Sequence, residues 1–122
     1  MSASDPKRTS LGEFGDGVGM KGIPAALQGL HDASLVSVEF NWNSRHCVLR
    51  FSGAPNPALQ RPFSIDFEGV TMVTAPAEHP WGTSGSVLEV KSDIPGKYAF
   101  VMQSGDEIVV ATDREPVRKA LD

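Results

Sequence analysis

From Ser34 onward, apolar and polar residues alternate with a period of two, the spacing of a β-strand that buries one face. In the first run the apolar positions are Val36, Val38, Phe40 and Trp42. In the second run they are Cys47, Leu49 and Phe51. The turn-forming residues 41–44 separate the two runs, so the pattern predicts an antiparallel hairpin.

Similar alternation later in the chain predicts further strands. These segments are residues 63–67 continuing into 70–73, then 87–91, 98–103 and 108–112. Gly69 interrupts the first of them, which suggests a bulge or a sharp bend. A short helix is expected at 23–30, with Pro24 near its start and Gly29 at its end. A second is expected at 112–121, because Thr112 and Glu115 have the spacing of a capping box. We therefore expect a mainly β (β-rich α+β) fold, an antiparallel curled sheet or sandwich of about six strands with one or two short helices.

The chain of 122 residues is expected to form a flexible Gly-rich N-terminal tail, residues 1–22, and one β-rich domain, residues 23–122. Residues 17–22 match the G-x-G-x-x-G pattern of dinucleotide-binding loops. That pattern binds a dinucleotide where it follows a buried strand and opens a helix. Neither context is predicted here, so we expect no cofactor.

Composition narrows the classes of partner. Eleven basic and fifteen acidic residues give a formal net charge of -4, which argues against a nucleic-acid partner. A single cysteine, Cys47, cannot form an internal disulfide. No apolar run approaches the roughly 18–20 residues that span a bilayer. We expect a cytoplasmic protein without a membrane partner.

Candidate catalytic groups are few. His31 and Asp32 are adjacent, and a carboxylate beside an imidazole can make it a better base. Neighbours in an extended segment point to opposite faces, so a turn in which Asp32 binds local amides is the structural alternative. Cys47 could pair with His46 or His79 as nucleophile and base, but it lies on the apolar face of its predicted strand.

The three histidines, His31, His46 and His79, lack the spacing of metal ligands. We therefore expect no catalytic residues and no metal site. The alternative is an enzyme or small-ligand binder that uses His31, Asp32 and Ser84 in a cleft.

The segment Pro80-Trp81-Gly82 places a large aromatic ring in a turn between two predicted strands. Proline and glycine restrict this loop, so an exposed ring would bind a partner at a low entropic cost. The same ring could instead cover the open end of the core. The sequence leaves both alternatives open.

Four short motifs follow one another along the chain. They are Leu30-His31-Asp32-Ala33-Ser34-Leu35, Asn41-Trp42, Pro80-Trp81-Gly82-Thr83-Ser84 and Met102-Gln103-Ser104-Gly105-Asp106-Glu107-Ile108. Together they resemble a family of small bacterial proteins that read LHDA-x-L, DW, PWGxS and MQSGD-x-I and have no assigned activity. The resemblance covers about residues 30–112, with Asn41 in place of an acid and Thr83 after Gly82 as departures. By analogy of size and β-rich type, it suggests an immunity protein that neutralises a bacterial toxin.

These observations favour a soluble, non-catalytic binding module for a protein partner, immunity-like in character. The candidate binding residues are Trp81, Gly82, Ser84, His31, Asp32, Gln103, Ser104 and Asp106. A third hypothesis is a homodimer that forms through an uncovered edge strand.

Overall fold

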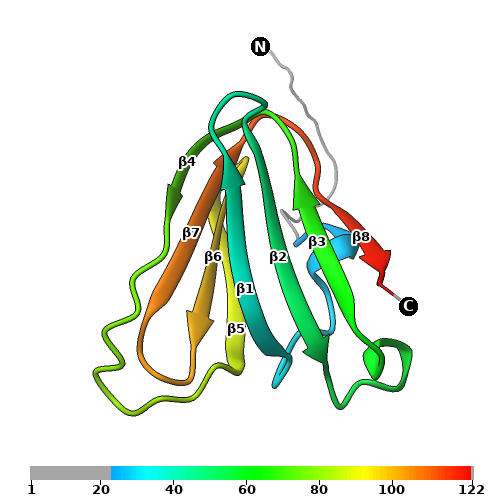
Figure 1. Ribbon diagram of the computed structural model, residues 1–122, viewed down its shortest axis with the longest axis vertical. Coiled ribbons are helices and arrows are strands. Elements are labelled where there is room, and N and C mark those ends of the chain that lie inside the picture. Colours follow the sequence, from blue (N-terminus) through cyan, green and yellow to red (C-terminus); the bar gives the residue numbers. More distant parts are fainter. Residues whose placement is uncertain (1–22, 122) are drawn as a thin grey trace.

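The computed structural model describes residues 23–121, which form two four-stranded antiparallel sheets (Figure 1). The first sheet has the strand order β1 (Ser34–Asn41), β2 (His46–Gly53), β3 (Phe63–Phe67) and β8 (Val117–Ala120). The second has the order β4 (Val70–Thr74), β7 (Glu107–Thr112), β6 (Lys97–Met102) and β5 (Val87–Ile94). Two single turns of 3-10 helix are η1 (Ala25–Leu27) and η2 (Pro57–Leu59). The predicted tail, residues 1–22 with its G-x-G-x-x-G pattern, lies outside the described residues.

The prediction of a mainly β, antiparallel fold is confirmed, although residues 23–121 contain eight strands instead of about six. Gly69 accounts for part of the difference. It ends a continuous predicted strand and has a φ of +67°, a conformation that strongly favours glycine. Here the chain leaves the first sheet at β3 and enters the second at β4. No helix among the described residues has the length and apolar character needed to cross a membrane.

The core fills the space between the sheets. The inward residues of β2 are those that the alternation predicts, and each faces a residue of β3: Cys47 with Phe67, Leu49 with Ile65, and Phe51 with Phe63. The rings of Phe51 and Phe63 stack with centroids 4.9 Å apart. Across the core, the ring of Phe67 meets Phe100 of β6 edge to face at 6.2 Å. The two layers are therefore joined by aromatic packing.

One predicted face assignment is wrong. Val36 is exposed, whereas Val38 and Phe40 lie opposite the inward residues Leu49 and Cys47. The pairing register shifts between Leu35 and Ser37, so β1 contains a bulge that turns Val36 outward. A bulge inserts one residue into a strand and changes which later residues face the core, which strict alternation cannot show.

The predicted C-terminal helix is also wrong, because residues 117–120 form β8 and pair with β3. The expected capping residue, Thr112, ends β7, and its hydroxyl donates to the carbonyl of Glu68. A strand here completes hydrogen bonding along β3, which an isolated short helix would not do. The expected N-terminal helix is reduced to the single turn η1, which Arg118 of β8 holds by donating to the carbonyls of Ala26 and Gln28.

A hydrogen-bonded corner joins the two sheets and fixes the start of β5. The N–H of Asp32 donates to the carbonyl of Val87 at 2.8 Å, and the N–H of Val87 donates to the carbonyl of Ala33 at 2.9 Å. The N–H of Leu35 donates to the carbonyl of Gly85 at 2.8 Å. These bonds bring the segment before β1 against the end of the long β4–β5 loop, so both meet at one end of the sandwich.

We expect Phe100→Ala to lower the free energy of unfolding by ~3–5 kcal/mol, because the fully buried ring leaves a cavity between the sheets. Leu88→Ala on β5, where the side chain is 41% exposed, is the matched control and should cost less than about 1 kcal/mol. Urea unfolding followed by circular dichroism measures both values. Equal losses for the two variants would contradict the assignment of Phe100 to the core.

Candidate functional site

The loop between β4 and β5, residues 75–86, carries Trp81 on the surface. The Trp81 side chain is 75% exposed, so the alternative in which its ring covers the core is wrong. Almost every residue of this loop is exposed. The ring is nevertheless held in place, and the contacts that hold it come from the β6–β7 turn.

Asp106 in the β6–β7 turn fastens this loop. Its buried carboxylate accepts hydrogen bonds from the N–H groups of Glu78 (2.8 Å) and His79 (3.0 Å to Oδ2), and from the hydroxyl of Ser104 at 2.7 Å. The ring Nδ1 of His79 lies 3.3 Å from Oδ2 of Asp106. The Ser104 hydroxyl, with the two backbone N–H groups and His79, lowers the pKa of Asp106 below its ordinary value, against the opposing effect of burial.

Two further contacts hold Trp81, one through its backbone and one through its ring. The N–H of Trp81 donates to the carbonyl of Ser104 at 2.8 Å. The ring lies against Gly105, where an added Cβ would come within 2.8 Å of Trp81 Cδ2. Gly105 also has a φ of +93°, so both its backbone and the ring above it require glycine. One part of the indole thus rests on the turn while most of it stays open to a partner.

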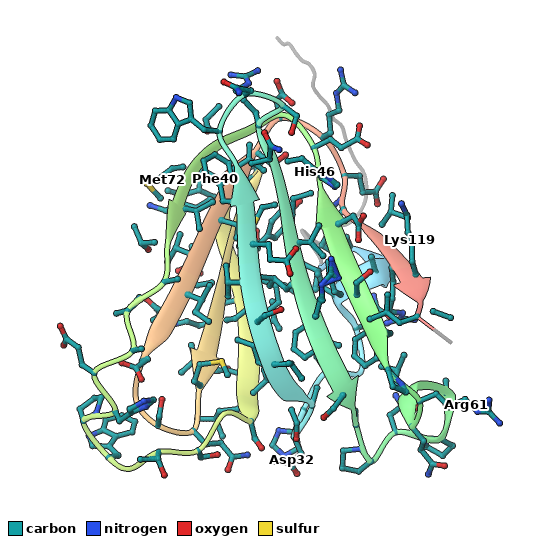
Figure 2. The ribbon with its side chains drawn as sticks, viewed as in Figure 1. Asp32, Phe40, His46, Arg61, Met72 and Lys119 are labelled. Atoms are coloured by element: carbon teal, nitrogen blue, oxygen red, sulfur yellow. The ribbon has the colours of Figure 1, made fainter. Side chains whose placement is uncertain are left out.

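His31 and Asp32 lie at the same end of the molecule, and Figure 2 shows Asp32 at the end away from the β1–β2 turn. Asp32 has a φ of +65°, so the segment is a turn, as the structural alternative predicts, but the described hydrogen bond of its carboxylate comes from Gln103 and not from a local amide. The two side chains approach each other, with His31 Nε2 3.4 Å from Asp32 Oδ2. The Asp32 carboxylate accepts a hydrogen bond from the side-chain amide of Gln103, and the Nδ1–H of His31 donates to the carbonyl of Leu88 at 2.8 Å.

Seven of the eight predicted binding residues are linked by bonds or by chain continuity. Asp32 binds Gln103, which precedes the Ser104-Gly105-Asp106 turn that holds Trp81. Gly82 donates its N–H to the carbonyl of His79 at 3.1 Å and so closes the loop. Ser84 lies in the same loop, but its link is indirect: its hydroxyl accepts from the N–H of Ser86, whose carbonyl accepts from Gln103, and it bonds to neither His31 nor Asp32 in the described hydrogen-bond network.

Sequence reasoning missed the partners of Asp106. The two N–H groups at Glu78 and His79 carry no side-chain signal of their own. Asp and Ser side chains in turns commonly accept hydrogen bonds from nearby backbone N–H groups, so the Ser104-Gly105-Asp106 turn marks Asp106 as an acceptor without showing that its partners lie in the β4–β5 loop.

Other candidate nucleophiles and ligands are placed where they do little chemistry. Burial raises the pKa of the Cys47 thiol to about 11, so it stays protonated at neutral pH. His46 lies on the opposite face of β2, with Nε2 3.4 Å from Asp66 Oδ2. The Ser104 hydroxyl is buried and donates to Asp106. Within residues 23–121, no three His, Cys, Asp or Glu side chains gather as a metal site would require.

Comparison with known proteins returned no protein family, no curated protein and no solved structure that matches this chain. The geometry of the loop is therefore the basis on which a function is assigned.

Asp106 should make the stability of the protein depend on pH in the acidic range. Its carboxyl has a lower pKa in the folded chain than in the unfolded chain, so its stabilising effect is complete above about pH 4 and is lost as pH falls through the folded value. We expect Asp106→Asn to be less stable than the wild type at neutral pH. The difference between the two free energies of unfolding should shrink below about pH 4, as measured by urea unfolding at a series of pH values. A difference that stays constant with pH would contradict this role.

The fluorescence of Trp81 reports whether the ring is open to solvent. In a Trp42→Phe background, iodide should quench Trp81 almost as efficiently as free tryptophan, because three quarters of the side chain is exposed. Gly105→Ala should move the emission spectrum, since the added methyl group displaces the ring. A Trp81 signal protected from iodide would contradict the exposed position.

Proposed function

We propose that this chain is a non-catalytic binding module for a protein partner and that its contact surface is built on the Trp81 loop. The observation that carries the proposal is the combination of exposure with restraint. An indole that is 75% exposed sits on a backbone held by the buried carboxylate of Asp106. Tryptophan is enriched among the residues that dominate protein interfaces, and a restrained loop loses little entropy on binding.

The surroundings of Trp81 support a partner with polar and basic groups. Glu78 and His79 are exposed residues of the same loop, and Asp32 is half-exposed near the same end. The formal net charge of the chain is -4, which steers a cationic partner toward it. An apolar anchor with polar groups around it is the usual composition of a transient protein interface.

The chemistry of the same end supports a binding role more than a catalytic one. The carboxylates of Asp32 and Asp106 are occupied by Gln103, Ser104 and the loop backbone. The Ser104 hydroxyl contacts the Asp106 carboxylate, but both side chains are buried beneath the loop, where a substrate does not reach them. A general base must reach the proton that it abstracts within about 3 Å, or through one water molecule.

The resemblance to the family with LHDA and PWGxS motifs extends the proposal. The motif residues Asp32, Trp81, Ser104 and Asp106 are the ones that build and fasten this loop. By the analogy with immunity proteins, the partner is a bacterial toxin met in the cytoplasm. The proposed partner is neither a nucleic acid nor a membrane, because the net charge is -4 and no apolar run is long enough to span a bilayer.

Trp81→Ala should abolish partner binding without unfolding the chain. The immobilised full-length protein is used to capture proteins from the native lysate, and a captured protein is identified, purified and titrated by calorimetry. We expect Trp81→Ala to raise the Kd about 30-fold or more, as for a central interface residue, and to change the free energy of unfolding by less than about 1 kcal/mol.

Ile94→Ala is the matched control, because Ile94 is 57% exposed at the end of β5 away from the loop and should leave the Kd within about threefold of the wild type. Equal affinity of the purified partner for the wild type and Trp81→Ala would contradict the proposal. So would the absence of any captured protein at micromolar sensitivity.

A further inference from the structure

A second apolar surface lies at the end of the sandwich away from the Trp81 loop. A hollow of about 500 Å³ opens between β1 and β4, and its apolar lining includes Phe40, Trp42, Met72 and Val73. Figure 2 shows Phe40 and Met72 beside each other at this opening. Phe40 is 38% exposed and meets Trp42 edge to face at 6.0 Å. Large side chains of this kind rarely gather on the surface of a protein without a contact to make.

Both walls of the hollow are sheet edges. Within residues 23–121, β4 pairs only with β7, and β1 pairs only with β2 apart from its start, where Ser34 and Leu35 bond to residues 85–86 (Figure 1). An edge strand presents unpaired N–H and C=O groups, which a further strand can bind. The hollow therefore combines free backbone groups with an apolar floor.

The charges on the four edge strands distinguish this side of the molecule from the other. The edge strand β5 carries Glu89, Lys91 and Asp93, and the edge strand β8 carries Arg118 and Lys119. Charged side chains are a common protection of an edge against pairing.

The two edges at the hollow lack this protection. The sequence of β4 contains no charged residue. The single charge of β1, Glu39, is neutralised by the guanidinium of Arg50 in β2 through bonds of 3.0 and 3.1 Å. The unprotected edges are thus the two that flank the hollow.

The sequence of β1 is complementary to itself in one antiparallel register. The bulge near Val36 leaves the second half of the strand regular. If Phe40 faces Phe40 of a second copy, then Val38 lies beside Trp42 of that copy, which is the first residue of the β1–β2 turn. On the other side, Glu39 faces Asn41 of that copy, so no like charges are opposed. Opposite side chains of an antiparallel pair contact each other directly, which makes this register favourable on both faces.

We propose that β1 is a dimer interface through which two copies of this chain pair about a two-fold axis at Phe40. The two first sheets are then joined through residues 39–41 of each β1, and Met72 of β4 covers the joined Phe40 rings. A two-fold interface uses the same surface of both copies, which is what the register of β1 provides. Arg45, the charged residue at the hollow, belongs to the β1–β2 turn beyond the paired segment.

The first arm of the test measures mass. Sedimentation of the full-length chain between about 1 µM and about 1 mM should show the mass rising from 13.0 kDa toward twice that value, a dimer of moderate affinity. Phe40→Lys should raise the dissociation constant about tenfold or more. Leu88→Lys, at a position of similar exposure on β5, should leave it unchanged. A mass of 13.0 kDa at every concentration would overturn the proposal, as would a dimer that persists in Phe40→Lys.

The second arm tests the register and does not require Phe40→Lys to fold. Phe40→Cys is made in a Cys47→Ala background, because Cys47 lies directly opposite position 40 within the same chain. Residues facing each other across two strands have Cβ atoms about 4.5–5.5 Å apart, close to the range that a disulfide joins. Mild oxidation should link two chains through position 40, whereas Leu88→Cys in the same background should stay unlinked.

Linkage through position 88 alone, or none at either position, would overturn the proposal. A monomer in which Trp42 is shielded from iodide would do the same, since it would mean that another segment of the chain covers the hollow.

Discussion

The packing of the two sheets is centred on Phe67, the last residue of β3. Its ring contacts Phe100 and Tyr98 of β6, both with centroids 6.2 Å away, and so fixes how the layers face each other. Two residues later, Gly69 turns the chain out of the first sheet and into the second. The crossing is therefore made beside the side chain that joins the layers. This packing fixes the positions of the two ends of the sandwich, where the exposed side chains of Trp42 and Trp81 lie.

At one end, the position of an exposed residue depends on a buried charge. A carboxylate removed from water is costly unless donors surround it, and Asp106 is surrounded by donors that belong to the loop and to its own turn. Movement of residues 78–81 would leave this carboxylate without its partners. The cost of that loss keeps Trp81 in one place, although its own side chain makes few contacts. The β6–β7 turn, which lies beneath the loop, thus restrains the exposed Trp81.

The sequence predicts the features that depend on local alternation and turn chemistry. The β1–β2 hairpin, the inward residues Cys47, Leu49 and Phe51, and the turn at Ser104–Asp106 follow from residue type and spacing.

Features that depend on the rest of the fold were beyond that reasoning. The capping-box spacing at Thr112 predicts a helix by local propensity, but pairing with β3 makes residues 117–120 a strand. The bulge at Val36 is visible only in the pairing register of β1 with β2. The hollow between β1 and β4 exists only because two sheets meet there. For the site, the motifs identified the residues that build the loop, while the N–H groups that bind Asp106 have no signature in the side chains.

The two ends of the sandwich depend on different interactions, a buried carboxylate at one end and backbone and apolar groups at the other, which argues that they act independently. The Trp81 loop is held by a carboxylate whose bonds weaken on protonation, so its geometry responds to acid. The β1 edge offers backbone groups and apolar side chains, and its one acidic residue is already paired with Arg50. The pairing proposed there adds hydrogen bonds between main chains and buries Phe40, and neither effect depends on the protonation of Asp106. The proposed dimer is therefore compatible with the proposed binding role, because pairing at β1 leaves the Trp81 loop of each copy open.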